Sequence, residues 1–308
     1  MKTLLIIILF IVGGAGCSYA QQDPMVSQYM FNGLYLNPAY AGSHKYWTST
    51  FSFRKQWVGF EGSPQTVIGA IDGPLAGQKM GLGLIYFNDQ IGVTKQNSIL
   101  ANYAYRIRVS ENGRLALGIS AGISQFSAEL TSLTIWDTDD QVFMNNVSSK
   151  ILPRFGFGIY YTDKNWYAGF SIPTLIAYEK GRDFSLNLNK SSFLNRHYLL
   201  TGGYIFKVSE NVKLKPSVLL KYLPHAPLQA DINLGVLIKD MFWIGGSFRS
   251  GDAGVILLEY QSNNYFRIGY AYDLTFSELR RHSSGSHEIM IGIDFGKDMI
   301  KTKTPRYF

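Results

Sequence analysis

The sequence predicts an all-β fold, a transmembrane outer-membrane β-barrel of about 14 antiparallel strands. Apolar and polar residues alternate in segment after segment, as they must in a strand with one apolar and one polar face. Only 17% of the residues are charged while 15% are aromatic, a balance that favours contact with lipid. After residue 20, no apolar stretch approaches the roughly 18 residues that a membrane-spanning helix needs. A chain with these properties crosses a membrane with strands.

Residues 1–20 have the pattern of a secretory signal peptide: a lysine, an apolar run too short to span a bilayer, and small residues at Ser18 and Ala20. We expect cleavage after Ala20. The alternative is lipid attachment at Cys17, although Gly14 stands where such signals usually carry a larger aliphatic residue. Cleavage after Ala20 leaves no cysteine, which excludes disulfides and cysteine metal sites.

Residues 21–45 are predicted to form a short N-terminal segment that is either periplasmic or a plug of the barrel. Asn37-Pro38 ends any helix begun between residues 27 and 34, because the residue before proline is pushed out of the α region. The segment also carries apolar residues that need somewhere to pack, and the barrel mouth is the nearest place. These residues are Met25, Tyr29, Met30, Phe31 and Leu34.

Residues 46–297 are predicted to form the barrel. The alternation is clearest from 265 to 276, where Phe266 and Ile268 fall on the face opposite to Arg267. The number of strands is even, as in a single-chain outer-membrane barrel with both termini on one side. The predicted strands are 46–57, 64–73, 79–88, 95–109, 113–127, 151–162, 165–174, 196–208, 212–223, 227–238, 241–250, 252–261, 264–276 and 286–297.

The connections alternate in length. Compact, turn-forming connections follow the even-numbered strands, as at 110–112 and 209–211, whereas the longest ones follow odd-numbered strands, near 128–150, 174–195 and 277–285. Barrels of this kind have short periplasmic turns and longer outer loops. The first strand therefore runs outward, and the chain is expected to end in a C-terminal periplasmic tail, residues 298–308.

A soluble β-sandwich is the competing fold, since it also buries one apolar face per strand. A spanning sheet must instead close on itself, because unpaired strand edges cannot be solvated in hydrocarbon. The signal peptide, the low charge and the aromatic residues near strand ends favour the barrel, whose interfaces carry aromatic girdles. These aromatic residues include Trp47, Trp57, Trp166, Tyr198 and Tyr222.

The same alternation places charged residues of both signs in the lumen. Such a set indicates either a water-filled pore or ion pairs around a plug, and the near balance of signs favours ion pairs. The residues are Arg54, Asp72, Arg106, Arg108, Arg154, Lys213, Lys215, Lys221, Asp231, Arg249, Glu259, Arg267, Asp273, Glu288 and Asp294.

The sequence carries no pattern typical of a catalytic or metal site. Five histidines are scattered without metal-ligand spacing, and no phosphate-binding glycine loop is present. Ser286 and His287 are adjacent in a strand and so point to opposite faces, which rules them out as nucleophile and base. The net charge of +7 forms no basic block that would indicate nucleic acid. We therefore expect neither an enzyme nor a cofactor, a metal or a nucleic-acid partner.

Two blocks, residues 21–47 and 54–66, closely resemble the PorP/SprF family of outer-membrane proteins of the type IX secretion system, and the ending at 304–308 also looks like that family. The matching positions of the first block are Asp23, Gln28, Tyr29, Asn32, Asn37, Pro38, Ala39, Tyr40, Ala41 and Gly42. Those of the second block are Arg54, Gln56, Trp57, Gly59, Gly62, Pro64 and Thr66.

The resemblance implies a non-enzymatic barrel of the outer membrane that binds other secretion components or a secreted cargo. It implies a role in the export or surface retention of large surface proteins, gliding adhesins among them in some family members. Expected partners are outer-membrane lipid, periplasmic ring or peptidoglycan-linked components, and the C-terminal domain of a cargo protein. The alternative is a passive diffusion pore, indicated by a glycine-rich and partly charged lumen.

The matching residues are candidates for plug or partner contacts, and two interpretations stay open. Arg54 and Gln56 fall on the polar face of the first strand, from which a lumen-facing arginine can hold the N-terminal segment through charge-assisted hydrogen bonds. Alternatively, both blocks only fix the first hairpin and its folding register. The candidates are Gln28, Tyr29, Asn32, Asn37, Pro38, Tyr40, Gly42, Arg54, Gln56, Trp57 and Gly59.

Overall fold

The computed structural model describes residues 24–75, 78–133, 146–177, 196–224, 226–262 and 265–295. The expected signal peptide, residues 1–20, and the expected tail, residues 298–308, lie outside these residues.

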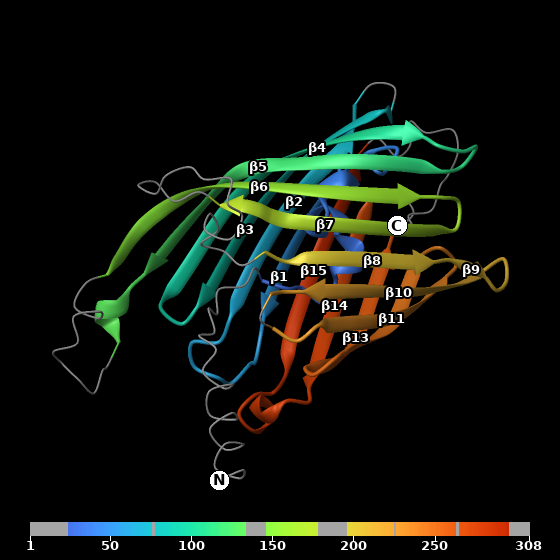
Figure 1. Cartoon of the computed structure of the whole chain (residues 1–308). Coiled ribbons are helices and arrows are strands. Elements are labelled where there is room, and N and C mark those ends of the chain that lie inside the picture. Colours follow the sequence, from blue (N-terminus) through green and yellow to red (C-terminus); the bar gives the residue numbers. More distant parts are fainter. Residues whose placement is uncertain are drawn as a thin grey trace, which may run out of the picture.

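The described chain forms one closed antiparallel sheet (Figure 1). It has fourteen strands, because β8 and β9 are two parts of one strand that both pair with β10. The strands are β1 (Trp47–Lys55), β2 (Gln65–Pro74), β3 (Met80–Ile91), β4 (Thr94–Arg108), β5 (Arg114–Ala128), β6 (Val147–Thr162), β7 (Trp166–Ala177), β8 (Tyr198–Tyr204), β9 (Phe206–Lys207), β10 (Val212–Tyr222), β11 (Gln229–Ile238), β12 (Phe242–Arg249), β13 (Ala253–Gln261), β14 (Phe266–Thr275) and β15 (Ser286–Phe295).

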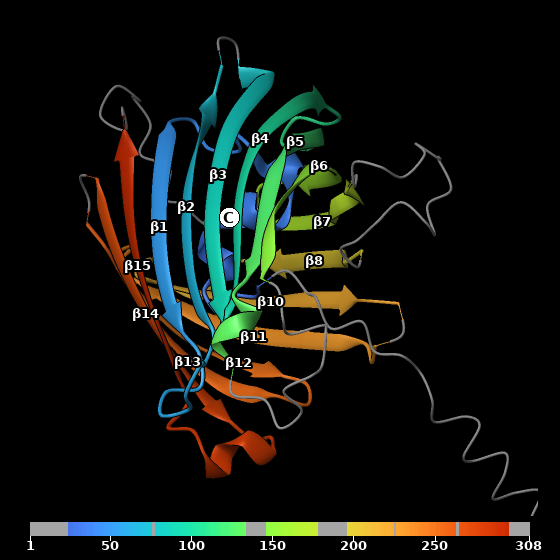
Figure 2. The same cartoon turned by 90° about the vertical axis from the view of Figure 1, so that its left-hand side faces the viewer.

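The first and last strands close the sheet. Strands β1 and β15 pair from Trp47 with Phe295 to Lys55 with His287, and every other strand pairs with its sequence neighbours. Figure 2 shows β1 and β15 side by side at this seam. The predicted barrel of fourteen antiparallel strands is confirmed. Closure leaves no sheet edge along the seam, which is what a sheet in hydrocarbon requires.

The strand ends depart from the prediction at a few places for local reasons. The first strand ends at Lys55 rather than at residue 57, because Trp57 takes a positive φ of 48° and turns the chain. Gln56 therefore lies beyond the strand and not on its polar face. The strand predicted at 196–208 is interrupted at Ile205, whose side chain is buried.

Side chains on the two faces of the sheet have opposite character. On β5, Ile119 points outward and is 58% exposed, whereas its neighbour Ser120 faces the lumen and is 5% exposed. The same pattern of exposed apolar and buried polar residues recurs on β13 and β15. A soluble sandwich would show the reverse, so the outer surface is the one that lipid covers.

The charged residues expected in the lumen are buried there, with one exception. Arg108 is exposed, and its guanidinium donates to the carbonyl oxygens of Ser110 and Glu111 at 3.1 and 3.2 Å. It lies at the periplasmic rim, where the long side chain reaches the turn after β4 more easily than the lumen. Arg108 shares the face of Arg106 on β4, as expected, but it is not buried in the lumen.

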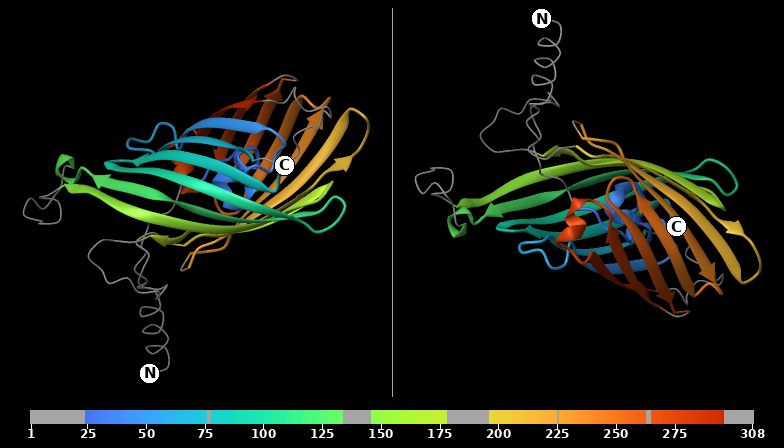
Figure 3. Two further views of the ribbon diagram at one scale, coloured as in Figure 1. Left: turned by 90° about the horizontal axis from the view of Figure 1, so that it is seen from above. Right: turned by 90° about the horizontal axis from the view of Figure 1, so that it is seen from below.

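Residues 24–46, which we call the lumen segment, lie inside the barrel except for the exposed Lys45 (Figure 3). The segment contains three single turns: η1 (Tyr29–Phe31), α2 (Gly33–Leu36) and η2 (Pro38–Tyr40). Figure 3 shows these turns, in blue, within the ring of strands. No helix in the described part of the chain is both long and apolar enough to cross a membrane.

Candidate functional site: the filled lumen

The lumen segment has a local structure that its own sequence specifies. Asn32 links the first two turns, since its N–H donates to the Tyr29 carbonyl and its carbonyl accepts from the Tyr35 N–H. Asn37 is extended and starts η2 by accepting a hydrogen bond from the Ala39 N–H through its side chain at 2.9 Å. Pro38 then occupies the first position of that turn, where its missing N–H costs nothing. The helix expected to end at Asn37-Pro38 is thus a single α-helical turn.

Apolar side chains of the lumen segment pack against the inner wall. Leu34, Ala39 and Tyr40 are at most 3% exposed and belong to a cluster with wall residues such as Ile68 and Tyr160. The Tyr40 and Tyr160 rings meet edge to face at 5.5 Å. Burial of this kind is worth about 1.5–3 kcal/mol for each large side chain. The apolar residues of the segment therefore do find their place in the lumen.

Glycines in the wall make room for this packing. A Cβ on Gly118 would lie 2.1 Å from the Ala39 nitrogen, and one on Gly158 would lie 2.0 Å from the Asn37 side-chain oxygen. A Cβ on Gly269 would lie 2.2 Å from the side-chain oxygen of Gln28. At these three places the lumen segment occupies the space of a wall side chain.

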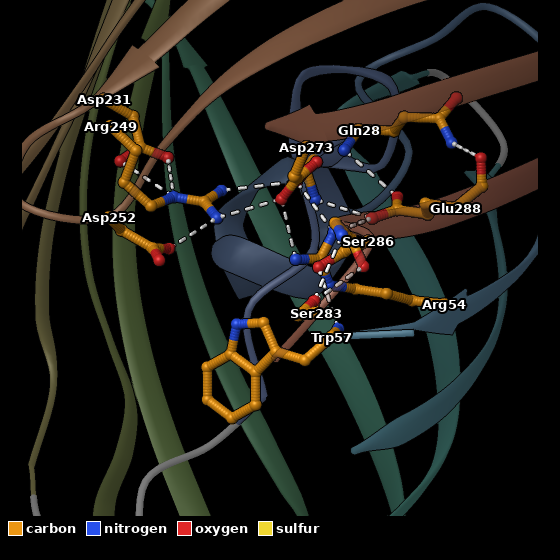
Figure 4. Close-up of polar contacts among 12 residues, drawn as sticks. Gln28, Arg54, Trp57, Asp231, Arg249, Asp252, Asp273, Ser283, Ser286 and Glu288 are labelled. Atoms are coloured by element: carbon orange, nitrogen blue, oxygen red, sulfur yellow. Dashed lines mark hydrogen bonds and ion pairs between the residues drawn. The ribbon is translucent and has the colours of Figure 1, made fainter. Parts of the chain in front are cut away.

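Arg54 joins the wall to the start of the lumen segment (Figure 4). Its guanidinium donates to the Ser27 hydroxyl at 2.9 Å, to Asp273 at 2.8 Å and to Glu288 at 3.3 Å. Glu288 in turn accepts the main-chain N–H groups of Ser27 at 2.7 Å and of Gln28 at 3.1 Å. Of the two interpretations, the first therefore describes the contacts of Arg54: a lumen-facing arginine holds the N-terminal segment.

Arg249 extends this arrangement to the neighbouring strands. It pairs with Asp231 at 3.0 Å, with Asp252 at 3.4 Å and with Asp273 at 3.5 Å. All of these side chains except Asp252 are nearly inaccessible to solvent. We call Arg54, Asp231, Arg249, Asp252, Asp273 and Glu288 the outer ion-pair network, since they lie near the ends of strands that meet the outer loops. The expected ion pairing in the lumen is confirmed for these residues.

A second set of contacts holds the other end of the lumen segment. Asp72, near the periplasmic end of β2, accepts the Gly42 N–H at 2.7 Å. Arg106, near the periplasmic end of β4, donates to the Ala41 carbonyl. Together with the outer ion-pair network, these contacts show that the segment runs from the outer mouth of the barrel to its periplasmic mouth.

The middle of the segment is held by Asn37 and its neighbours. The Asn37 amide donates to the carbonyl oxygens of Ile159 at 2.9 Å and Phe170 at 3.3 Å. Ser171 donates its hydroxyl to the Leu36 carbonyl at 2.6 Å. One asparagine thus joins strands β6 and β7 to a turn inside the lumen.

Tyr29 contacts a third region of the wall. Its hydroxyl accepts a hydrogen bond from the Asn233 side chain on β11. This bond joins η1 of the lumen segment to β11.

The second sequence block lies mostly outside the lumen. Trp57 and Gly59 belong to the outer loop between β1 and β2, and Gly59 has a φ of +97° that favours glycine. This loop is bound to the last outer loop: the Trp57 N–H donates to the Ser286 hydroxyl at 3.1 Å, and the Val58 N–H donates to the Gly285 carbonyl at 2.8 Å. Gln56 lies beside Trp57 and is half-buried.

The candidate residues thus fall into two groups. The lumen group comprises Gln28, Tyr29, Asn32, Asn37, Pro38, Tyr40, Gly42 and Arg54, and the outer-loop group comprises Gln56, Trp57 and Gly59. Sequence reasoning missed Ser27, Ser171 and Asn233, whose side chains complete the contacts. Small polar residues on the lumen face are common in barrels, so nothing in the pattern singles these out.

Within the described ranges, no group of three or more histidine, cysteine, aspartate or glutamate residues could hold a metal ion. The acidic residues of the outer ion-pair network are instead engaged by two arginines.

A family model for the type IX secretion system membrane protein PorP/SprF matches residues 18–293, which is most of the chain. The chain belongs to this family. The PorP/SprF protein described here is accordingly a membrane protein of the type IX secretion system and an outer-membrane β-barrel, and its family associates with membrane lipid and other secretion components.

Solved structures with a similar fold are outer-membrane barrels. The toluene transporter TbuX of Ralstonia pickettii has a TM-score of 0.50 at 8% identity, over 85% of this chain and 92% of that one. The translocator domain of the autotransporter NalP from Neisseria meningitidis has a TM-score of 0.40 at 11% identity, over 87% of this chain and 92% of that one. The first likeness shows the fold alone. A comparison with curated protein sequences gave no match.

Proposed function

We propose that this PorP/SprF protein is a non-enzymatic binding component of type IX secretion. It binds secretion components or a secreted cargo, and it supports the export or surface retention of large surface proteins, including gliding adhesins. Its partners are periplasmic ring or peptidoglycan-linked components and the C-terminal domain of a cargo protein.

The observation that carries this proposal is the filled lumen. Two cavities beside the lumen segment have volumes of only about 30 and 20 Å³, which leaves room for one or two water molecules each. Around these two cavities, in the part of the barrel that the structure describes, the lumen segment leaves little path for a diffusing solute. The outer and periplasmic surfaces of the barrel remain available for binding a protein, which supports a binding role over a transport role.

The proposed organisation of the chain follows the sequence. Residues 1–20 are a signal peptide cleaved after Ala20, residues 21–45 an N-terminal segment, residues 46–297 the barrel and residues 298–308 a periplasmic tail. Mass spectrometry of the N-terminal peptide from purified outer membranes checks the first of these. A peptide that begins at Gln21 supports cleavage, whereas a lipid-modified Cys17 contradicts it.

Deletion of the gene tests the export function. We expect the deletion strain to lose specific large proteins from the cell surface, as measured by surface biotinylation and mass spectrometry of whole cells. Complementation with the wild-type gene should restore them. Unchanged export and retention of every surface protein would overturn the proposal.

A passive diffusion pore is the second candidate function. One observation favours it: Lys213, Lys215 and Lys221 all face the lumen from β10 and form a row along one wall. Planar bilayer recordings of the purified protein distinguish the two functions. Steady channel openings of the wild-type barrel would favour the pore.

A further inference from the structure

We propose that the inner wall of the barrel is a peptide-binding groove and that the lumen segment is its exchangeable occupant. The ligand class is a short, irregular peptide with an asparagine-proline turn, and a second molecule of that class can take the place of the lumen segment. This inference depends only on the geometry of the lumen and stands whether or not the export function is correct.

The wall recognises the main chain of the lumen segment. Glu288 accepts two consecutive N–H groups, from Ser27 and Gln28, at 2.7 and 3.1 Å. Asp72 accepts a third N–H, from Gly42, at 2.7 Å. Charged acceptors of this kind make hydrogen bonds roughly twice as strong as neutral ones. Because the bonds are to backbone atoms, they would accept a different peptide with the same backbone path.

Wall donors complement these acceptors. The Ser171 hydroxyl donates to the Leu36 carbonyl at 2.6 Å, and the Arg106 guanidinium donates to the Ala41 carbonyl. The wall therefore supplies acceptors to the two ends of the segment and donors between them, so that it binds the segment largely by its main chain.

Asn37 supplies the sequence selectivity. Its side-chain amide bonds to two wall carbonyls, those of Ile159 and Phe170, while its oxygen accepts the Ala39 N–H within the segment. Only a side chain with both a donor and an acceptor can make all of these bonds. A Cβ on Gly158 would come within 2.0 Å of the Asn37 oxygen, so the absence of a side chain at Gly158 leaves the space that Asn37 fills.

The lumen segment is also structurally separable from the barrel. It contributes no strand, and the sheet closes between β1 and β15 without it. Its turns are stabilised by hydrogen bonds within the segment, such as Asn37 N–H to Gly33 carbonyl at 3.0 Å. Its departure would therefore break no strand pairing. Lys45, just before the first strand, is exposed and gives access to the junction.

The test starts from the complete protein. A specific protease site is inserted after Lys45, the full chain is folded in detergent, and the junction is cut. We expect the cut segment to stay bound during gel filtration and to exchange with an excess of fluorescent synthetic peptide of residues 24–45 below the unfolding temperature of the barrel. A labelled peptide that never enters the cut barrel, whether the cut segment stays or leaves, would overturn the proposal.

Two peptide variants test the selectivity. The Asn37→Ala peptide should bind at least about tenfold more weakly, because it loses the two hydrogen bonds that the Asn37 amide makes to the wall. The Ser43→Ala peptide is the matched control, since the buried Ser43 hydroxyl has no hydrogen-bond partner among the described residues. Equal binding of the two variants, or of a scrambled peptide, would contradict a specific groove.

Two barrel variants test the fit from the wall side. Gly118→Ala would place a methyl group 2.1 Å from the Ala39 nitrogen and should reduce labelled-peptide binding by at least about tenfold. Gly202→Ala meets no atom closer than 3.6 Å and should bind like the parent. Equal binding by both barrels would count against the groove. If Gly118→Ala fails to fold, the peptide variants alone decide the question.

Discussion

Arg54 shows how much of this structure can depend on one side chain. It contacts the lumen segment through Ser27 and two wall strands through Asp273 and Glu288. All of these side chains are buried, so each charge relies on the others for compensation. The attraction between these charges offsets the cost of taking them out of water only while the arrangement is complete, and breaking it leaves an uncompensated buried charge.

We predict that Arg54→Ala destabilises the folded barrel by about 3–5 kcal/mol, since Glu288 and Asp273 lose their shared cation. Urea unfolding in detergent, followed by the shift of the folded band in electrophoresis, measures this. Lys95→Ala is the control: Lys95 pairs with Glu129 at the surface, where both side chains are largely exposed, and its loss should change stability by at most about 1 kcal/mol. Equal effects of the two substitutions would contradict the role given to the network.

Gly42 is a second residue on which stability depends, because the backbone leaves no room for a Cβ there. It has a φ of +64°, and a Cβ there would lie 2.6 Å from the Gly73 carbonyl oxygen. We predict that Gly42→Ala lowers barrel stability by more than the ~1–2 kcal/mol that positive φ alone costs. Gly92→Ala isolates the backbone effect, because Gly92 has a φ of +55° and no atom within 4 Å. The same unfolding assay compares the two, and a Gly42 variant no worse than the Gly92 variant would be inconsistent with the close approach.

For single residues, the sequence predicts the face of the sheet to which a side chain points better than it predicts the residues that this side chain contacts. The inward direction of Arg54 follows from the alternation along β1, but its two acidic partners are more than 200 residues away in sequence. The same alternation predicts that Gln56 and Trp57 continue the first strand. This is wrong, because the chain turns at Trp57, which has a positive φ, and β1 ends at Lys55. Arg108 is exposed and not buried in the lumen, because its length lets it reach the turn from the strand end.

The outward-facing side chains of the strands show where the apolar, lipid-facing band of the barrel ends. On the hairpin of β3 and β4, outward residues change from apolar to polar along the strand: Ile99 is 43% exposed, while Asn97 accepts a hydrogen bond from Asn88 at 2.8 Å. The apolar band therefore ends between Ile99 and Asn97, and the tip of this hairpin lies beyond the hydrocarbon.

We predict that Ile119→Arg, in the middle of β5, costs about 2–4 kcal/mol in a lipid bilayer, because the charge faces hydrocarbon. Asn97→Arg, on the outward face above the apolar band, should cost about 0–1 kcal/mol. Reversible unfolding in phospholipid vesicles measures both. A similar cost for the two would mean that the apolar band lies elsewhere.

The strands can be predicted from the sequence because a period of two is the strongest signal that a lipid-facing strand can give. The interruption between β8 and β9 cannot be predicted in this way, since it depends on the packing of the buried Ile205 with Leu237 and Trp243. Its apolar character fits either face, so the local pattern carries no sign of the break. Tertiary packing, and not the sequence of the strand, sets that position.

The whole molecule is a closed wall around a filled interior. The sequence predicts the wall because its strands repeat the same two-residue pattern. It does not predict the position of the N-terminal segment, because the three irregular turns of that segment have no period. The contacts of the lumen segment with Glu288 on β15, and those of Asn37 with β6 and β7, become visible only when the barrel is closed.

We predict that the full chain shows no steady conductance in planar bilayers, and that deletion of residues 24–43 produces channel openings, because the side chains that fill the lumen are gone. The temperature-dependent band shift in electrophoresis confirms that the deleted protein is a folded barrel. If the folded deletion variant showed no channel openings, a part of the protein other than the lumen segment would be what closes the barrel to ions.

The seam between the first and last strands also has a consequence for how the protein is made. The bond between the Ser27 N–H and Glu288 spans 261 positions of the chain, and the seam joins residues about as far apart. Contacts this distant form slowly, since a long loop must be closed first. A nascent chain therefore cannot secure its N-terminal end until its final hairpin arrives, and until then it must be kept from aggregating in the aqueous space that it crosses.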